Sequence, residues 1–139
     1  MPNPAKMAGD AAMTDAPLEV VFDHLYARRM RDLDALARGL DADVVHQGVL
    51  PSLVCNGRDA VLERMRSSLD GGDSGIERLE LSAAGDRVIV GIAGPRFREI
   101  PFLDGEVFIV FTVRDGLIAR MDDYRTRDDA LEAVVAGTP

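Results

Sequence analysis

The sequence predicts an α+β domain in which a curved, mainly antiparallel sheet wraps around helices from the first half of the chain. Apolar residues at helical spacing gather before residue 70, whereas β-branched and alternating runs follow it. Short turns join the first of these later runs to the second and the third to the fourth, as is usual between antiparallel strands. Repeated βαβ units and a glycine-rich loop after a strand are both missing from the sequence, which excludes dinucleotide-binding folds.

The chain has 139 residues, 47% hydrophobic and 29% charged, so we expect one globular domain. Its formal net charge is −8. An acidic chain lacks the cationic surface that releases counterions on binding nucleic acid or anionic lipid. We therefore expect neither nucleic acid nor a membrane as a partner.

Residues 1–16 have no hydrophobic period, and we expect a disordered tail before a single domain at residues 17–139. The tail has no apolar run and does not resemble a secretory signal. The charge-free stretches fall short of the roughly 20 apolar residues of a spanning helix. Together with the single cysteine, these features predict a cytoplasmic protein.

Three helices are expected in the first half of the chain. The first, at residues 17–30, begins with a proline. Its apolar residues recur at helical spacing, and Asp23, Arg28 and Arg29 lie away from them. A second short helix carries leucines at 33, 36 and 40, with Asp32 as its N-cap. The third covers residues 60–69 and ends at the glycines that follow.

Five strands and a last helix complete the predicted order. The strands are expected at residues 44–50, 76–83, 87–93, 105–113 and 117–124. An Asp-Gly pair predicts a tight hairpin before the last strand, and residues 94–104 are expected to form a loop. Thr126 begins a capping box for a helix through Val135.

Four local patterns, in their order and spacing, resemble the nuclear transport factor 2-like superfamily, and within it the SnoaL-like polyketide cyclases, limonene epoxide hydrolases and ketosteroid isomerases. They are MRDLDAL at 30–36, DVVH at 43–46, NGRDAV at 56–61, and DGLI at 115–118 with DDY at 122–124. The resemblance implies a cone-shaped half barrel with a deep, largely apolar internal pocket, often in a homodimer.

The resemblance does not fix the function, because this fold hosts isomerases, dehydratases, hydrolases, cyclases and non-catalytic proteins. The two aspartates of ketosteroid isomerases fall on Gly48 and approximately Ile109, so that chemistry is absent. The limonene epoxide hydrolases have an aspartate where this chain has Asp123. However, their Arg-x-Asp is missing from residues 88–93, and their tyrosine falls on His46.

Asp123 is the strongest catalytic candidate. Alternation along the last strand places it on one face with Ala119 and Met121, and the resemblance turns that face toward the pocket. A carboxylate among apolar side chains can act as a general acid or base near neutral pH. The alternative is a solvated carboxylate, or one paired with Arg120 or Arg125.

His46 is the second catalytic candidate, on a strand face shared with Val44 and Gly48. An imidazole in the pocket can move protons or orient a water. We expect Asp123 to be the acid/base and His46 its partner, and the alternative is a hydrogen-bonded core or rim histidine.

The predicted ligand-binding residues lie on the first helix and on two strands. Tyr26 follows Phe22 by one helical turn, so the two side chains share one face of the helix. If this face turns inward, Tyr26 can donate a phenolic hydrogen bond to a ligand. The alternative is that Tyr26 packs at the edge of the core. The other predicted pocket residues are Val44, Gly48 and Met121. His24 is expected at the solvated surface.

Two functional classes stay open. The first is cofactor-free acid/base chemistry, such as hydrolysis, isomerisation or cyclisation, on an apolar or amphiphilic organic ligand. No metal motif or nucleophile turn is present in the sequence, so we expect neither a metal nor another cofactor. The second class is a non-catalytic module for ligand binding or dimerisation. A homodimer through the outer sheet face is expected because both faces of residues 107–113 are apolar apart from Thr112.

Overall fold

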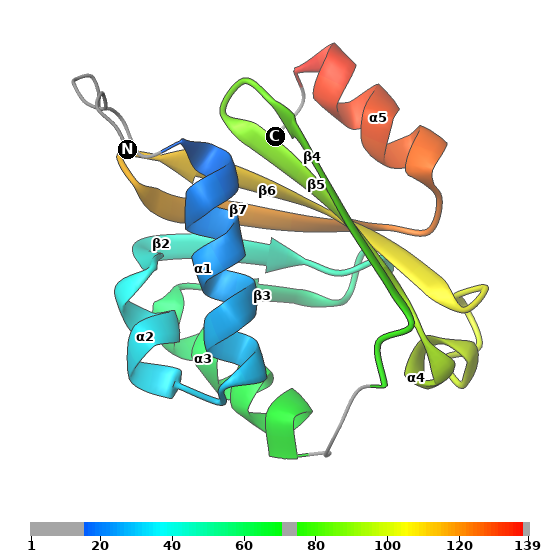
Figure 1. Ribbon diagram of the computed structural model, residues 1–139, viewed down its shortest axis with the longest axis horizontal. Helices are drawn as coiled ribbons and strands as arrows, with labels where there is room; N and C mark the ends of the chain where they lie inside the picture. Colours follow the sequence, from blue (N-terminus) through cyan, green and yellow to red (C-terminus); the bar gives the residue numbers. More distant parts are fainter. Residues whose placement is uncertain (1–15, 71–74, 138–139) are drawn as a thin grey trace, which may run out of the picture.

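Helices lie on both sides of one six-stranded sheet in the computed structural model, which describes residues 16–70 and 75–137 (Figure 1). The α+β class is confirmed. Most of the predicted disordered tail, residues 1–15, lies outside the described residues. Within the described residues, no helix is long and apolar enough to cross a membrane.

The predicted helices form close to the expected positions. They are α1 (Pro17–Arg29), α2 (Leu33–Arg38), α3 (Arg58–Asp70) and α5 (Arg127–Ala136). The two predicted N-caps are confirmed: Asp32 Oδ1 accepts a hydrogen bond from the Ala35 amide at 3.0 Å, and Thr126 Oγ1 accepts one from the Asp129 amide at 3.1 Å. A short helix, α4 (Pro95–Arg98), forms where a loop was expected, with proline in its first turn.

The sheet has the spatial order β3-β2-β7-β6-β5-β4. Its strands are β2 (Leu40–Gln47), β3 (Val54–Asn56), β4 (Arg78–Ala84), β5 (Arg87–Ala93), β6 (Glu106–Arg114) and β7 (Leu117–Tyr124). Neighbours pair antiparallel except β2 and β7, which are parallel. This one parallel pair brings an early strand beside the last strand.

The start of β2 and the whole of β3 differ from the prediction. Leu36 and Leu40 are both about 1% exposed, so the core takes one leucine from the end of α2 and the next from the start of β2. The four-residue spacing of these two leucines therefore comes from two successive elements that both reach the core, and not from a longer helix. The three-residue strand β3 follows a turn and pairs with β2 at His46. It was not predicted, because three residues are too few to show a strand pattern in the sequence.

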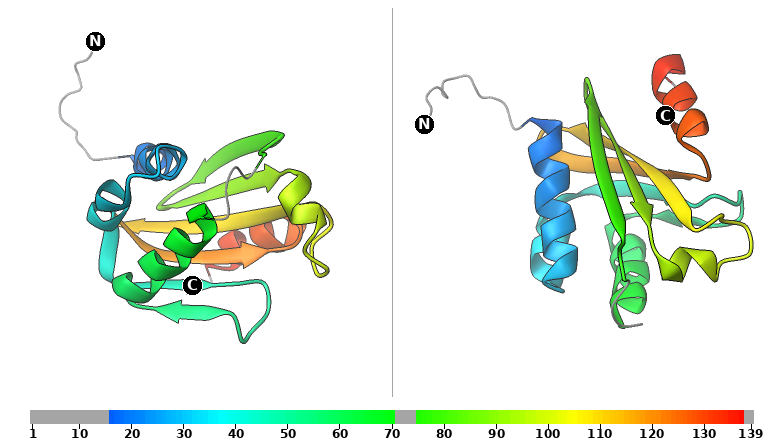
Figure 2. Two further views of the ribbon diagram at one scale, coloured as in Figure 1. Left: turned by 90° about the horizontal axis from the view of Figure 1, so that it is seen from below. Right: turned by 45° about the vertical axis from the view of Figure 1, so that its right-hand side comes forward.

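Each face of the sheet has its own apolar cluster. The concave face packs against α1, α2 and α3, whereas Ile89, Phe108 and Val110 on the outer face pack with α5. Figure 2 shows α1 and α5 on opposite sides of the sheet. Both faces of β6 are apolar because both are covered within one chain.

A register shift in the β6–β7 pair changes which residues of β7 face the core. Ile118 is fully buried in the concave cluster with Met121, although strict alternation assigned that face to Ala119. A β-bulge of this kind inserts a residue into one strand and reverses the side-chain direction beyond it. The expectation for Ala119 was wrong for this reason.

Candidate functional site

The two predicted catalytic residues meet at the parallel strand pair. The β2–β7 register places His46 opposite Met121, and Asp123 follows two residues later. His46 Nε2 lies 3.0 Å from Asp123 Oδ1, and each side chain keeps 15% of its surface exposed. The fold thus joins residues that are 77 positions apart in the chain.

The alternative partner of Asp123 belongs to the opposite sheet face. Arg120 Nε donates to both carboxylate oxygens of Asp122, at 3.0 and 2.9 Å. Asp122 and Asp123 are adjacent on one strand, so their side chains point to opposite faces. Arg120 is therefore the partner of Asp122, and the idea that it pairs with Asp123 was wrong.

The hydrogen bond specifies what each group can do. A carboxylate can only accept, so Nε2 of His46 carries the hydrogen when Asp123 is ionised. The other ring nitrogen, Nδ1, has no hydrogen-bond partner among the described residues. Nδ1 is then the free acceptor of a histidine–carboxylate pair, an arrangement suited to general base catalysis.

His24 is buried, and the expectation of a solvated surface residue was wrong. It is 5% exposed, and its ring meets Phe111 edge-on, with 5.4 Å between the ring centroids. Neither ring nitrogen has a hydrogen-bond partner within the described part of the chain. Burial, followed by the charges of Arg28 and His46, lowers the pKa of His24 to about 3. His24 is therefore neutral at physiological pH.

Arg28 also turns inward, unlike the prediction that placed it on the polar side of α1. Burial is the main cause of its lowered pKa, and the charge of Arg96 on α4 lowers it further. The charge of Asp123 acts in the opposite direction. Arg28 is thus a cation close to the His46–Asp123 pair.

Phe22 and Tyr26 face outward and do not line an interior pocket. They are 61% and 59% exposed, whereas Val21, His24 and Ala27 form the buried side of α1. The large side chains at four-residue intervals suggested the inward face, but the helix packs on its smaller residues. Small side chains let α1 approach the sheet closely.

The remaining predicted pocket residues pack in or beside the core. Val44 is fully buried and Met121 is 2% exposed. A Cβ atom on Gly48 would lie 2.7 Å from the Leu53 Cβ, so Leu53 occupies the place of a larger side chain at this position. Ligand contact by these residues stays a prediction.

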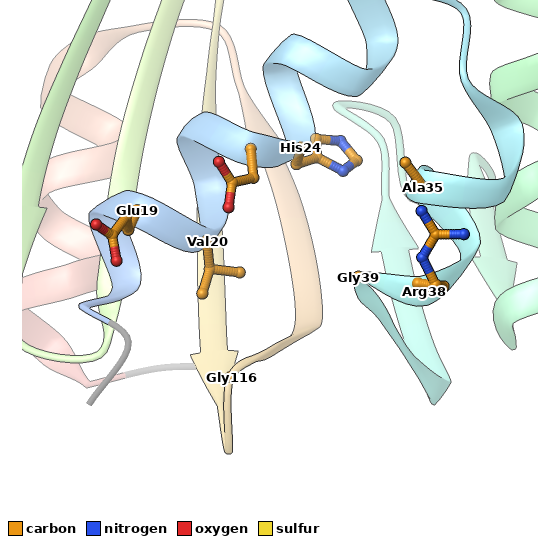
Figure 3. Close-up of a pocket in the computed structure, with 8 residues that line it drawn as sticks. Glu19, Val20, His24, Ala35, Arg38, Gly39 and Gly116 are labelled. Atoms are coloured by element: carbon orange, nitrogen blue, oxygen red, sulfur yellow. The ribbon is translucent and has the colours of Figure 1, made fainter. Parts of the chain in front are cut away.

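A hollow of about 300 Å³ opens between α1, α2 and the turn before β7 (Figure 3). Its lining includes Glu19 and Asp23 from α1, His24, and Arg38 from α2. His46 and Asp123 do not line this hollow. Among the described residues, no three His, Cys, Asp or Glu side chains gather where they could hold a metal ion.

Solved structures with the same fold include several bacterial proteins. A protein named as a polyketide cyclase from Sinorhizobium meliloti is 24% identical with a TM-score of 0.62, covering 76% of this chain and 93% of its own. A nuclear transport factor 2-like protein of unknown function from Cytophaga hutchinsonii is 12% identical with a TM-score of 0.58, covering 86% and 99%. TerC, crystallised with polyporic acid, is 20% identical with a TM-score of 0.57, covering 86% and 98%.

These low identities show a shared fold and nothing finer. No curated protein matches the chain in sequence. The family model of the SnoaL-like domain matches residues 21–121, from within α1 to within β7. Because this match covers most of its length, the chain belongs to the SnoaL-like domain family.

Proposed function

We propose that the protein is a SnoaL-like enzyme that performs cofactor-free acid/base chemistry on a small organic molecule, with His46 and Asp123 as its catalytic pair. The 3.0 Å hydrogen bond between the two side chains, at a place where both stay partly exposed, carries this proposal. Relatives named as polyketide cyclases and the polyporic acid in TerC support a small organic ligand.

The pair moves one proton in each half of the reaction. His46 Nδ1 accepts a proton from a carbon next to a carbonyl group, or from a water, and becomes an imidazolium. The Asp123 carboxylate holds the ring in position and stabilises its positive charge. The imidazolium then returns the proton to another carbon in an isomerisation or to the new alkoxide in a cyclisation. In a hydrolysis, where the deprotonated water attacks carbon and a C–O bond breaks, it returns the proton to the departing oxygen. A positioned base of this kind contributes about 10²- to 10⁴-fold in rate.

The competing function is a non-catalytic ligand-binding or dimerisation module. Two observations favour it: Leu53 fills the space at Gly48, where ketosteroid isomerases have a base, and β5 lacks the Arg-x-Asp of the epoxide hydrolases. Both observations exclude the catalytic mechanisms of particular relatives. Neither removes the His46–Asp123 pair, so we rank the enzyme first.

Deuterium exchange distinguishes the two functions. We expect the protein to accelerate deuterium uptake from D₂O into the acidic C–H positions of acetophenone or α-tetralone, followed by proton NMR. Asp123→Asn and His46→Gln should each lower the rate by about 10²-fold or more, because each variant removes one half of the pair. Asp43→Asn, an exposed carboxylate on the same strand as His46, is the matched control and should exchange as the natural protein does.

The result that contradicts the catalytic proposal is equally direct. If the natural protein binds these ketones without accelerating exchange, or if Asp123→Asn exchanges at the full rate, the pair has no such role. The non-catalytic module would then be the better explanation.

A further inference from the structure

Two arginines lie near each other on the concave side of the fold, although the whole chain has a formal net charge of −8. Arg28 on α1 and Arg96 on α4 lie close enough for the charge of Arg96 to lower the pKa of Arg28. Asp123 is the carboxylate whose charge acts on Arg28, and it already accepts a hydrogen bond from His46. The carboxylate that acts on Arg28 is therefore already engaged by another side chain.

Several other arginines of the protein pair with carboxylates. Ion pairs join arginines and acidic residues at the surface: Arg66–Glu63, Arg78–Glu106, Arg98–Glu77 and Arg127–Glu80. By contrast, the guanidinium of Arg28 makes no hydrogen bond or ion pair with any described residue. Arg96 donates one long hydrogen bond, 3.4 Å, to the Ser68 carbonyl. Both arginine side chains are only partly buried, so their free N–H donors are within reach of a bound anion.

His24 adds an independent sign of a missing partner. Its two ring nitrogens are buried without hydrogen bonds in the part of the chain that the structure describes, and a buried imidazole normally has at least one. The ring is neutral, so it offers one N–H donor and one acceptor. It lies beside Arg28 and also lines the hollow between α1 and α2, where Figure 3 shows it directed away from its own helix.

We propose that Arg28 and Arg96 bind the carboxylate of an organic acid, with the His24 N–H as a further donor, and that this acid is the class of molecule on which the His46–Asp123 pair acts. The second half of this proposal rests on the proposed function, whereas the binding half does not. A guanidinium matches the two oxygens of a carboxylate with parallel N–H donors, which an uncharged ketone or ester cannot use equally well. A bound anion also offsets the repulsion between the two arginines.

Matched pairs of acids and amides test the binding half. Benzoate and benzamide have nearly the same shape and differ in charge, and hexanoate and hexanamide form the aliphatic pair. By isothermal titration calorimetry, we expect at least one acid to bind about tenfold or more tightly than its amide. Arg28→Gln and Arg96→Gln should each remove this preference. Arg29→Gln, the exposed neighbour on α1, is the matched control and should keep it.

The proposal is overturned by equal affinity for acid and amide, by a loss of acid binding in Arg29→Gln as large as in Arg28→Gln, or by no binding of either acid up to about 10 mM. Inorganic phosphate binding as tightly as both acids would also overturn it, because the site would then recognise charge alone. Thermal unfolding confirms that each variant is folded, and Arg28→Lys, which keeps the charge, should retain part of the preference.

Asp123→Asn separates this proposal from the proposed function. Removing the carboxylate next to Arg28 should tighten acid binding, while it abolishes deuterium exchange. Acid binding that depends on Arg28 without any exchange activity would leave the anion site standing and end the catalytic proposal. Weaker acid binding in Asp123→Asn would contradict the anion site.

Discussion

At the scale of single residues, His24 couples stability to pH. Its pKa is about 3 in the folded protein and about 6.5 in an unfolded chain, so the unfolded state binds more protons between these values. The contribution of this group is fully present above about pH 6.5 and is lost as the pH falls toward 3. The free energy of unfolding should fall by up to about 1.4 kcal/mol per pH unit in this range.

His24→Phe tests this linkage. The variant keeps a ring against Phe111 and removes both the titration and the unpaired nitrogens. Melting temperatures at pH 7 and pH 5 should differ less for His24→Phe than for the natural protein. Equal differences in the two proteins would show that His24 is not the group responsible.

Gly48 makes a second prediction at residue scale. A Cβ atom there would lie 2.7 Å from the Leu53 Cβ and 3.1 Å from the Leu53 carbonyl oxygen, so Gly48→Ala should destabilise the protein by about 1–3 kcal/mol in urea unfolding. Gly39→Ala is the control, because its Cβ would find only ordinary contacts, at 3.7 Å and beyond. A Gly48→Ala variant as stable as Gly39→Ala would contradict the close packing of Leu53.

The contact between His46 and Asp123 agrees with the pairing expected from the sequence, but the charged surroundings of the two residues were not predicted. Strand alternation and the family resemblance together selected Asp123 and His46. Arg28 and His24 were missed because polar side chains on an amphipathic helix are normally assigned to solvent. Their burial depends on the sheet that α1 covers, and helical periodicity alone does not contain that information.

At the scale of elements, α1 shows how size can mislead a periodicity argument. Leu18, Phe22, Tyr26 and Met30 recur every four residues, yet all are exposed, because the helix packs on the side that holds Val21 and Ala27. The length and position of the helix followed from its proline and its spacing. Its rotation depended on which side fits closely against the concave sheet.

The rotation of α1 is open to a stability test. Phe22→Ser and Tyr26→Ser should each change the free energy of unfolding by no more than about 0.5 kcal/mol, because both side chains are largely in water. Val21→Ala, at a fully buried position, should cost about 1–3 kcal/mol. The reverse order of effects in urea unfolding would mean that α1 packs on its other side.

At the scale of the whole molecule, the site is a product of topology. The order of elements could be predicted because helical and strand patterns occupy different parts of the chain. The parallel pairing of β2 with β7 could not, because no local pattern states which distant strand is the neighbour. The His46–Asp123 contact therefore forms only when the sheet is assembled from both ends of the domain.

The predicted homodimer also belongs to this scale, and the structure changes the surface on which it must form. The apolar outer face of β6 motivated the prediction, but α5 packs against Phe108 and Val110 there. The large apolar residues of α5 that stay in water are Leu131, 43% exposed, and Val135, 86% exposed. A dimer on this side of the sheet must therefore use the outer surface of α5.

Sedimentation velocity at micromolar concentration tests this arrangement. We expect a dimer for the natural protein and a shift toward monomer for Leu131→Asp with Val135→Asp, because burying two carboxylates without partners in an interface costs several kcal/mol. Phe22→Ser is the control, since it removes an exposed aromatic ring on the opposite side of the sheet and should leave this dimer intact. A monomeric natural protein would end the prediction. Loss of the dimer in Phe22→Ser alone would move the interface to α1.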